Sequence, residues 1–118
     1  MPGTYKDLKV YEKSYKAALA IYKRIAVKLP IEEKYGLKSQ IQRAAVSIPL
    51  NIAEGYGKGE SKKEMLRYMY MARGSVNEVL VLLELMKDLE YIPETEQGRA
   101  KAAYEEIGRM LTGFINKG

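Results

Sequence analysis

Two groups of polar residues in this 118-residue chain could do chemistry. The first recurs at helical spacing along two neighbouring predicted helices. Its members, called here the polar set, are Arg43, Ser47, Asn51, Glu54, Arg73, Ser75 and Glu78. An enzyme could use Glu54 and Glu78 as an acid–base pair oriented by Arg43. We favour an interhelical hydrogen-bonded and ionic network that fixes the register of the helices, because buried charges persist when they are paired. Whether Glu54 pairs with Arg43 or with Arg73 stays open.

The second group is a row of cations in the first third of the chain. Residues 1–43 hold ten Lys and Arg against four Asp and Glu, whereas residues 44–118 are nearly balanced. The row, called here the lysine face, consists of Lys6, Lys9, Lys13, Lys16, Lys23 and Arg24, and a glycine-rich turn adds Lys58, Lys62 and Lys63. Such cations could bind a phosphate backbone with salt-dependent affinity, although an ordinary solvated helix face looks the same. No base-reading motif is visible, so binding would follow charge and shape.

Cysteine and histidine are both absent. Their absence removes disulfides, thiolate nucleophiles, Ser-His-Asp triads and nearly every zinc or iron site. Di-iron bundles also use histidine beside their glutamates, so a carboxylate metal site is a weak hypothesis. We therefore expect no enzyme activity, no cofactor and no metal.

Helical periodicity accounts for the whole chain, and no stretch alternates like a strand. Apolar residues recur at spacings of three and four, and Pro30, Gly55 to Gly59 and Pro93 separate the segments. The predicted helices span about 5–29, 34–56, 62–90 and 94–116 of a single domain, 1–118. Four amphipathic helices with short connections predict an all-α, antiparallel up-down-up-down four-helix bundle.

Several residues carry finer expectations. Pro49 predicts a kink in the second helix, and Ser61 with Glu64 fits a capping box at the start of the third. Gly74 predicts the close approach of another backbone. Most tyrosines, namely Tyr11, Tyr15, Tyr22, Tyr68 and Tyr104, are predicted to face the core, whereas Tyr56 and Tyr70 lie off it.

Some apolar residues lie outside the predicted core stripes. These residues, called here the outer apolar set, are Val46, Leu50, Ala53, Tyr70, Val81 and Leu85. Two helices that contribute such residues suggest a contiguous patch, and we interpret it as a contact between subunits of a homo-oligomer. The start of the sequence has no apolar signal region and no apolar run is long enough to span a bilayer, so we expect a soluble, cytoplasmic protein.

Four stretches resemble one bacterial family. They are Tyr35–Tyr56 (YGLKSQIQRAAVSIPLNIAEGY), Ala72–Glu78, Tyr5–Tyr11 and Glu105–Leu111. The family comprises proteins encoded in intervening sequences of 23S ribosomal RNA genes, also labelled S23 ribosomal proteins. The resemblance implies a four-helix bundle that assembles as a ring-like homopentamer. It also implies kinship with the accessory variability determinant of diversity-generating retroelements, a basic pentameric bundle that binds nucleic acid and a reverse transcriptase.

These observations lead to one functional hypothesis and one alternative. The hypothesis is a non-enzymatic, basic, homo-oligomeric protein that binds nucleic acid, with RNA favoured over DNA, through the lysine face and the basic turn. Repetition of a weak cationic patch in an oligomer would raise its avidity. The alternative is a protein-interaction adaptor whose basic face docks an acidic protein, for example a reverse transcriptase.

Overall fold

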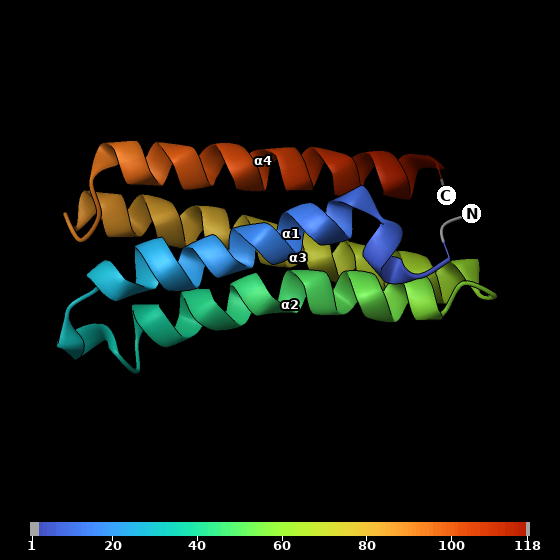
Figure 1. Ribbon diagram of the computed structural model, residues 1–118, viewed down its shortest axis with the longest axis horizontal. Coiled ribbons are helices and arrows are strands. Elements are labelled where there is room, and N and C mark those ends of the chain that lie inside the picture. Colours follow the sequence, from blue (N-terminus) through green and yellow to red (C-terminus); the bar gives the residue numbers. More distant parts are fainter. Residues whose placement is uncertain (1–2, 118) are drawn as a thin grey trace.

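Four helices run back and forth along one long axis, each antiparallel to the next along the chain (Figure 1). The computed structural model describes residues 3–117. The helices are α1 (Lys9–Ala20), α2 (Leu37–Gly57), α3 (Lys62–Asp88) and α4 (Glu94–Lys117). Helices α1 and α3 each pack against both α2 and α4, and the bundle measures 45 × 24 × 20 Å. The described residues contain no strand, and the predicted all-α four-helix bundle is confirmed.

The first predicted helix is divided into several pieces. Thr4 caps a 3-10 turn over Tyr5–Asp7, and Leu8 then adopts an extended backbone (φ −78°, ψ 125°), so α1 begins only at Lys9. After α1 the helix continues as a wider π turn, Ile21–Ile25, and then as a tighter 3-10 turn, Ala26–Lys28. The other three helices begin and end within three residues of the predicted bounds.

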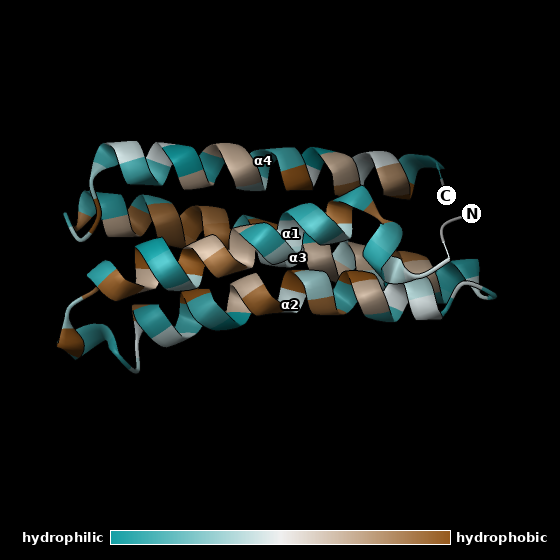
Figure 2. Ribbon diagram, viewed as in Figure 1, coloured by the Kyte–Doolittle hydropathy of each residue, from teal (hydrophilic) through white to brown (hydrophobic). Residues whose placement is uncertain are grey.

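The core runs the length of the bundle and receives side chains from every helix. Its fully buried members include Ile21, Ile41, Ile48, Ile52, Met69, Val79, Leu83, Met86, Ile107 and Leu111. Each aliphatic side chain of this size stabilises the fold by roughly 1.5–3 kcal/mol when buried. Figure 2 shows hydrophobic and hydrophilic residues alternating along each ribbon, as amphipathic helices require.

Two of the five tyrosines that were predicted to face the core do not face it. Tyr104 is buried as expected, and Tyr11 and Tyr68 are partly buried, but Tyr15 is 50% exposed and Tyr22 is 42% exposed. The prediction was therefore wrong for these two tyrosines. The core side of α1 consists instead of Val10, Ser14, Ala17 and Ala18, and Ile21 of the π turn continues it. Small residues allow α1 to lie close to its neighbours, and the bulkier tyrosines are displaced to its edge.

Two predictions about α3, those for Gly74 and for the capping box, are also corrected. A side chain at Gly74 would meet no atom within 4 Å in the described residues, so no backbone approaches it. The close approach occurs at Gly55, where a Cβ would lie 3.0 Å from the Tyr68 Cβ. Pro49 is buried, and α2 continues through it as one helix. The Ser61 hydroxyl caps α3 by accepting from the Glu64 N–H at 3.3 Å, whereas the Glu64 carboxylate binds Arg67.

Helix α3 ends in a Schellman motif. Glu90 has φ 65°, and the N–H groups of Glu90 and Tyr91 donate to the carbonyls of Lys87 and Met86. The Tyr91 hydroxyl then donates to Glu33 at 3.1 Å, and the other oxygen of this carboxylate accepts from the Leu37 N–H at 3.1 Å. Glu33 therefore ties the start of α2 to the end of α3.

Candidate nucleic-acid interface

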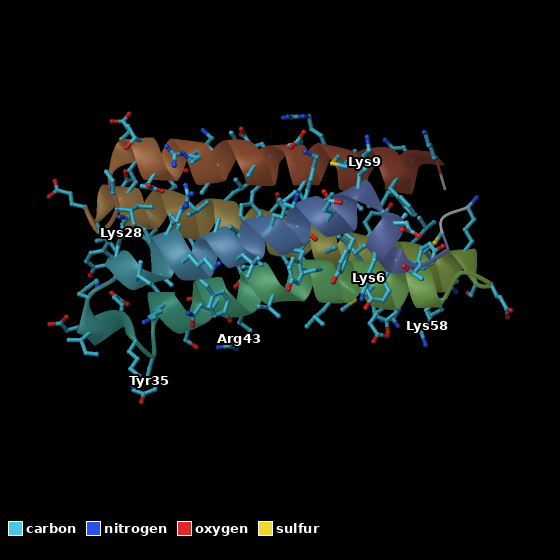
Figure 3. The ribbon with its side chains drawn as sticks, in the orientation of Figure 1. Lys6, Lys9, Lys28, Tyr35, Arg43 and Lys58 are labelled. Atoms are coloured by element: carbon cyan, nitrogen blue, oxygen red, sulfur yellow. The ribbon has the colours of Figure 1, made fainter. Side chains whose placement is uncertain are left out.

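The topology gathers several of the predicted cations at one end of the bundle. This end is formed by the start of α1, the turn between α2 and α3, and the last turn of α4 (Figure 1). Figure 3 shows Lys6 and Lys58 toward this end, and Lys28 at the opposite one. The predicted cations that these segments contribute, called here the basic end, are Lys6, Lys9, Lys58, Lys62 and Lys63. Lys117 in the last turn of α4 is a further exposed lysine at this end.

The side chains of the basic end are free to meet a ligand. All five lysines are exposed, and none of their ammonium groups forms an ion pair or hydrogen bond within residues 3–117. Their field acts on the neighbouring carboxyl of Glu64: the hydrogen bond from Arg67 lowers its pKa most, and the nearby Lys58 and Lys63 lower that pKa further. Two helix N-termini and two C-termini meet here, so the helix dipoles offset one another and the lysine charges set the sign of the potential.

The rest of the lysine face does not join this cluster. Lys13 forms an ion pair with Glu106 of α4 at 3.2 Å, and Lys16 forms one with Glu12 at 3.1 Å. Lys23 and Arg24 are exposed but lie roughly 20 Å from Lys9 along the helix axis. The predicted cations thus comprise an unpaired cluster at one end of the bundle and others that are paired or remote from it.

The polar set forms an interhelical contact through its hydroxyl groups. The Ser47 and Ser75 hydroxyls are 2.6 Å apart and join α2 to α3. The Ser47 hydroxyl is also 2.8 Å from the Ala44 carbonyl, and the Asn51 amide donates to the Ser47 carbonyl at 2.8 Å. These hydrogen bonds link α2 to α3 and hold the Asn51 amide against the backbone of α2.

The charged members of the polar set do not form the predicted ionic network. Arg43, Glu54 and Glu78 are exposed, and the described part of the chain contains no ion pair to any of them. Arg73 faces the other side of α3, where it donates to the Thr112 hydroxyl at 3.3 Å and lies 5.0 Å from the Tyr70 ring. These side chains lie at the solvated edge of the helix seam, where pairing adds little stability.

An open polar groove of about 660 Å³ lies between α2 and α3. Arg43, Ser47 and Asn51 line it from α2, and Ser75 and Glu78 line it from α3. Glu54 does not line it, so the two carboxylates of the acid–base hypothesis do not face one cavity. Over residues 3–117, no three acidic side chains gather in a way that could hold a metal ion. No helix in the described range is long and apolar enough to cross a bilayer.

Sequence reasoning missed an apolar groove of about 280 Å³ between α1 and α2. The residues that line it are Tyr5, Tyr11, Tyr15, Ala18, Leu19, Tyr22, Val46, Pro49, Leu50 and Ala53. The ring centroids of Tyr5 and Tyr11 are 4.9 Å apart, and those of Tyr11 and Tyr15 are 6.0 Å apart. The available signal was the recurrence of Tyr11, Tyr15 and Tyr22 on one side of the first helix, but the sequence predicted that these tyrosines face the core.

An antiparallel four-helix bundle with a cationic end is the class that these features define. Comparison with known proteins gives its family. The model of the 23S rRNA-intervening sequence protein family matches residues 6–113, and the chain belongs to this family. A crystal structure of a protein with unknown function from the S23 ribosomal protein family of Bacteroides thetaiotaomicron VPI-5482 is similar, with a TM-score of 0.81 and 26% identity over 90% of this chain and 97% of that one. No curated protein matches the sequence.

Proposed function

We propose that the chain is a non-enzymatic nucleic-acid-binding protein that contacts the phosphate backbone of RNA through its basic end. The observation that carries this proposal is the cluster of five exposed lysines without ion pairs, which come from two separate stretches of the chain, 6–9 and 58–63. A lysine that stabilises nothing within the bundle retains its full charge for a polyanion. Ammonium groups act here as point charges and read no base sequence.

Rigid elements hold these charges in place. Lys9 begins α1 and Lys62 and Lys63 belong to the first turn of α3, while Lys6 lies in a 3-10 turn whose cap is formed by Thr4 and Asp7. Lys58 follows α2 directly. Little backbone conformational entropy would therefore be lost on binding, which favours affinity.

The same proposal includes self-association, with the ring-like homopentamer implied by the family resemblance as the favoured form. Exposed apolar side chains support it: Leu50 of the outer apolar set is 59% exposed and Val81 is 65% exposed. Several basic ends on one particle would bind a long polyanion more tightly than one does, without any new contact.

A salt series tests the proposal. Fluorescence anisotropy with a single-stranded RNA should show log K falling linearly with log salt concentration. Replacing Lys9 and Lys58 together, as Lys9→Gln/Lys58→Gln, should reduce the salt slope by roughly 1–2 and leave the helical circular dichroism unchanged. If the parent protein does not bind RNA at low salt, and instead copurifies with an acidic protein partner, the adaptor alternative replaces this proposal.

A further inference from the structure

Two apolar surfaces of the bundle face solvent, and their shapes differ. The first is the concave groove between α1 and α2, where Leu50 is 59% exposed, Tyr15 is 50% exposed and Tyr22 is 42% exposed. The second is a convex stripe along the outer side of α3, called here the ridge, which contains Tyr70, Val81 and Leu85. These three residues fall within an arc of about 60° on a helical wheel.

One chain cannot cover either surface by itself. Helix α3 packs against α2 and α4, so its ridge points away from the groove between α1 and α2. A pairing of groove with groove would leave both ridges in water. Placing the ridge of one copy in the groove of another covers both apolar surfaces. It also fits a convex helix surface into a concave groove.

The charges around the groove and around the Val81 and Leu85 part of the ridge are opposite. On the groove side, Lys16 and Lys23 lie one turn before and one turn after Leu19, and Arg43 lines a continuation of the groove beside Leu50. Glu12 offsets part of this charge through its ion pair with Lys16, and Glu54 lies one turn beyond Leu50.

On the ridge side, Glu78 and Glu84 lie three residues before and after Val81, and Asp88 lies three residues after Leu85. Asp88 contacts Lys87 at 3.8 Å, whereas Glu78 and Glu84, like Lys23 and Arg43, have no ion pair in the range 3–117. Cations therefore predominate beside the groove and acids beside Val81 and Leu85, whereas Arg67 and Arg73 lie one turn before and one turn after Tyr70. The charges around Val81 and Leu85 favour ridge-to-groove contact and disfavour groove-to-groove contact.

We propose that a second copy of this chain seats its α3 ridge in the α1–α2 groove of the first. The inference rests on the self-association in the proposed function and adds which two surfaces meet. Because the surfaces differ, the contact is heterologous, and repeating it closes a ring or extends a filament. Rotational symmetry in a closed ring relates all copies by one axis, so their basic ends point toward the same side of it.

Complementary variants test this pairing. Leu50→Glu places a carboxylate in the groove and leaves the ridge intact, while Val81→Glu does the reverse. Both positions are exposed, so the circular dichroism spectrum and melting temperature should stay close to those of the parent. Each variant alone should sediment as a monomer at micromolar concentration, where the parent is an oligomer.

A mixture of the two variants should give a one-to-one heterodimer and nothing larger, because one intact groove meets one intact ridge while the other contact would bring both introduced carboxylates together. If the parent is an oligomer but the mixture stays monomeric, or if either variant stays oligomeric alone, the pairing is wrong. Continued oligomerisation of Leu50→Glu with lost RNA binding would assign the groove to nucleic acid instead. A monomeric parent would refute the self-association itself, a result separate from the other two.

Discussion

The two ends of the bundle have the same helix polarity and opposite chemistry. Each end combines two helix N-termini with two C-termini, so the backbone dipoles offset one another at both. One end carries the free lysines of the basic end, whereas the other combines six acids with four lysines, Lys28, Lys34, Lys38 and Lys87. The acids at that far end are Glu32, Glu33, Asp88, Glu90, Glu94 and Glu96. Side chains alone create the difference.

The difference extends to what the charged residues do for the fold. Glu33 accepts from the Leu37 N–H and from the Tyr91 hydroxyl, and it thereby joins two helix ends. The lysines of the basic end support no comparable contact within residues 3–117. A charged residue that stabilises the fold and one that is available to a partner can therefore be distinguished by their hydrogen bonds.

Removal of the Glu33 carboxylate should give the largest change in stability. Glu33→Ala leaves the Leu37 N–H and the Tyr91 hydroxyl without their acceptor, and we expect a loss of roughly 1–3 kcal/mol in the free energy of unfolding. Urea denaturation measures it. The matched control is Glu32→Ala, an exposed neighbour, which should change stability by no more than about 0.5 kcal/mol. Equal losses from the two variants would remove the structural distinction between the ends.

A substitution in the core between the two ends should change the free energy of unfolding less, and in the opposite direction. The Tyr104 hydroxyl is buried without a hydrogen-bond partner in the described residues, and burial raises its pKa. Tyr104→Phe removes that unsatisfied group and should leave stability unchanged or raise it by up to about 1 kcal/mol at neutral pH. Tyr91→Phe, which removes a partnered hydroxyl, should instead lower stability.

The raised pKa of Tyr104 also sets the sign of the pH dependence of stability. A raised pKa in the folded state means that folded Tyr104 keeps its proton at a pH where the unfolded chain releases it. Stability should therefore fall as the pH rises above about 10, the ordinary tyrosine value. The fall should be shallower in Tyr104→Phe, and identical alkaline profiles for parent and variant would show that this group does not contribute.

Cations added at the far end should have the smallest effect, and the quantity measured is the affinity for RNA. Glu32→Lys/Glu94→Lys raises the net charge by about four units, but the bundle is 45 Å long and the screening length at physiological salt is about 8 Å. RNA affinity, measured by anisotropy, should change by no more than about threefold. A large gain would mean that total charge, and not the position of the lysines, governs binding.

The sequence predicted α2, α3 and α4 well because long apolar stripes of isoleucine, leucine and methionine define their buried sides. It failed in the first helix for a physical reason. Its core side is made by small residues such as Ser14 and Ala17, while Tyr15 and Tyr22 carry more apolar surface and lie at the edge. The extended residue Leu8 and the π turn also change the phase of the helix, which periodicity cannot show.

The candidate site was predicted in composition but not in arrangement. Lys6, Lys9 and Lys58 were identified as candidate contacts, yet only the topology shows that they share one end. The pairing of Lys13 with Glu106 on α4 likewise depends on packing between helices distant in sequence. The spacing of the polar residues placed Ser47 and Ser75 on facing helices. The exposure of Arg43 and Glu54 depends on the width of the solvent-exposed groove between α2 and α3, which the sequence does not give.

The central claim is that the position of the lysines, and not their number, directs RNA binding. Its most direct test compares two double variants with the same change in charge: Lys9→Gln/Lys58→Gln at the basic end, and Lys28→Gln/Lys34→Gln at the far end, all exposed positions. At fixed low salt, the first pair should weaken RNA binding by roughly ten- to a hundredfold, and the second by no more than about threefold. Equal weakening by both pairs would contradict the claim.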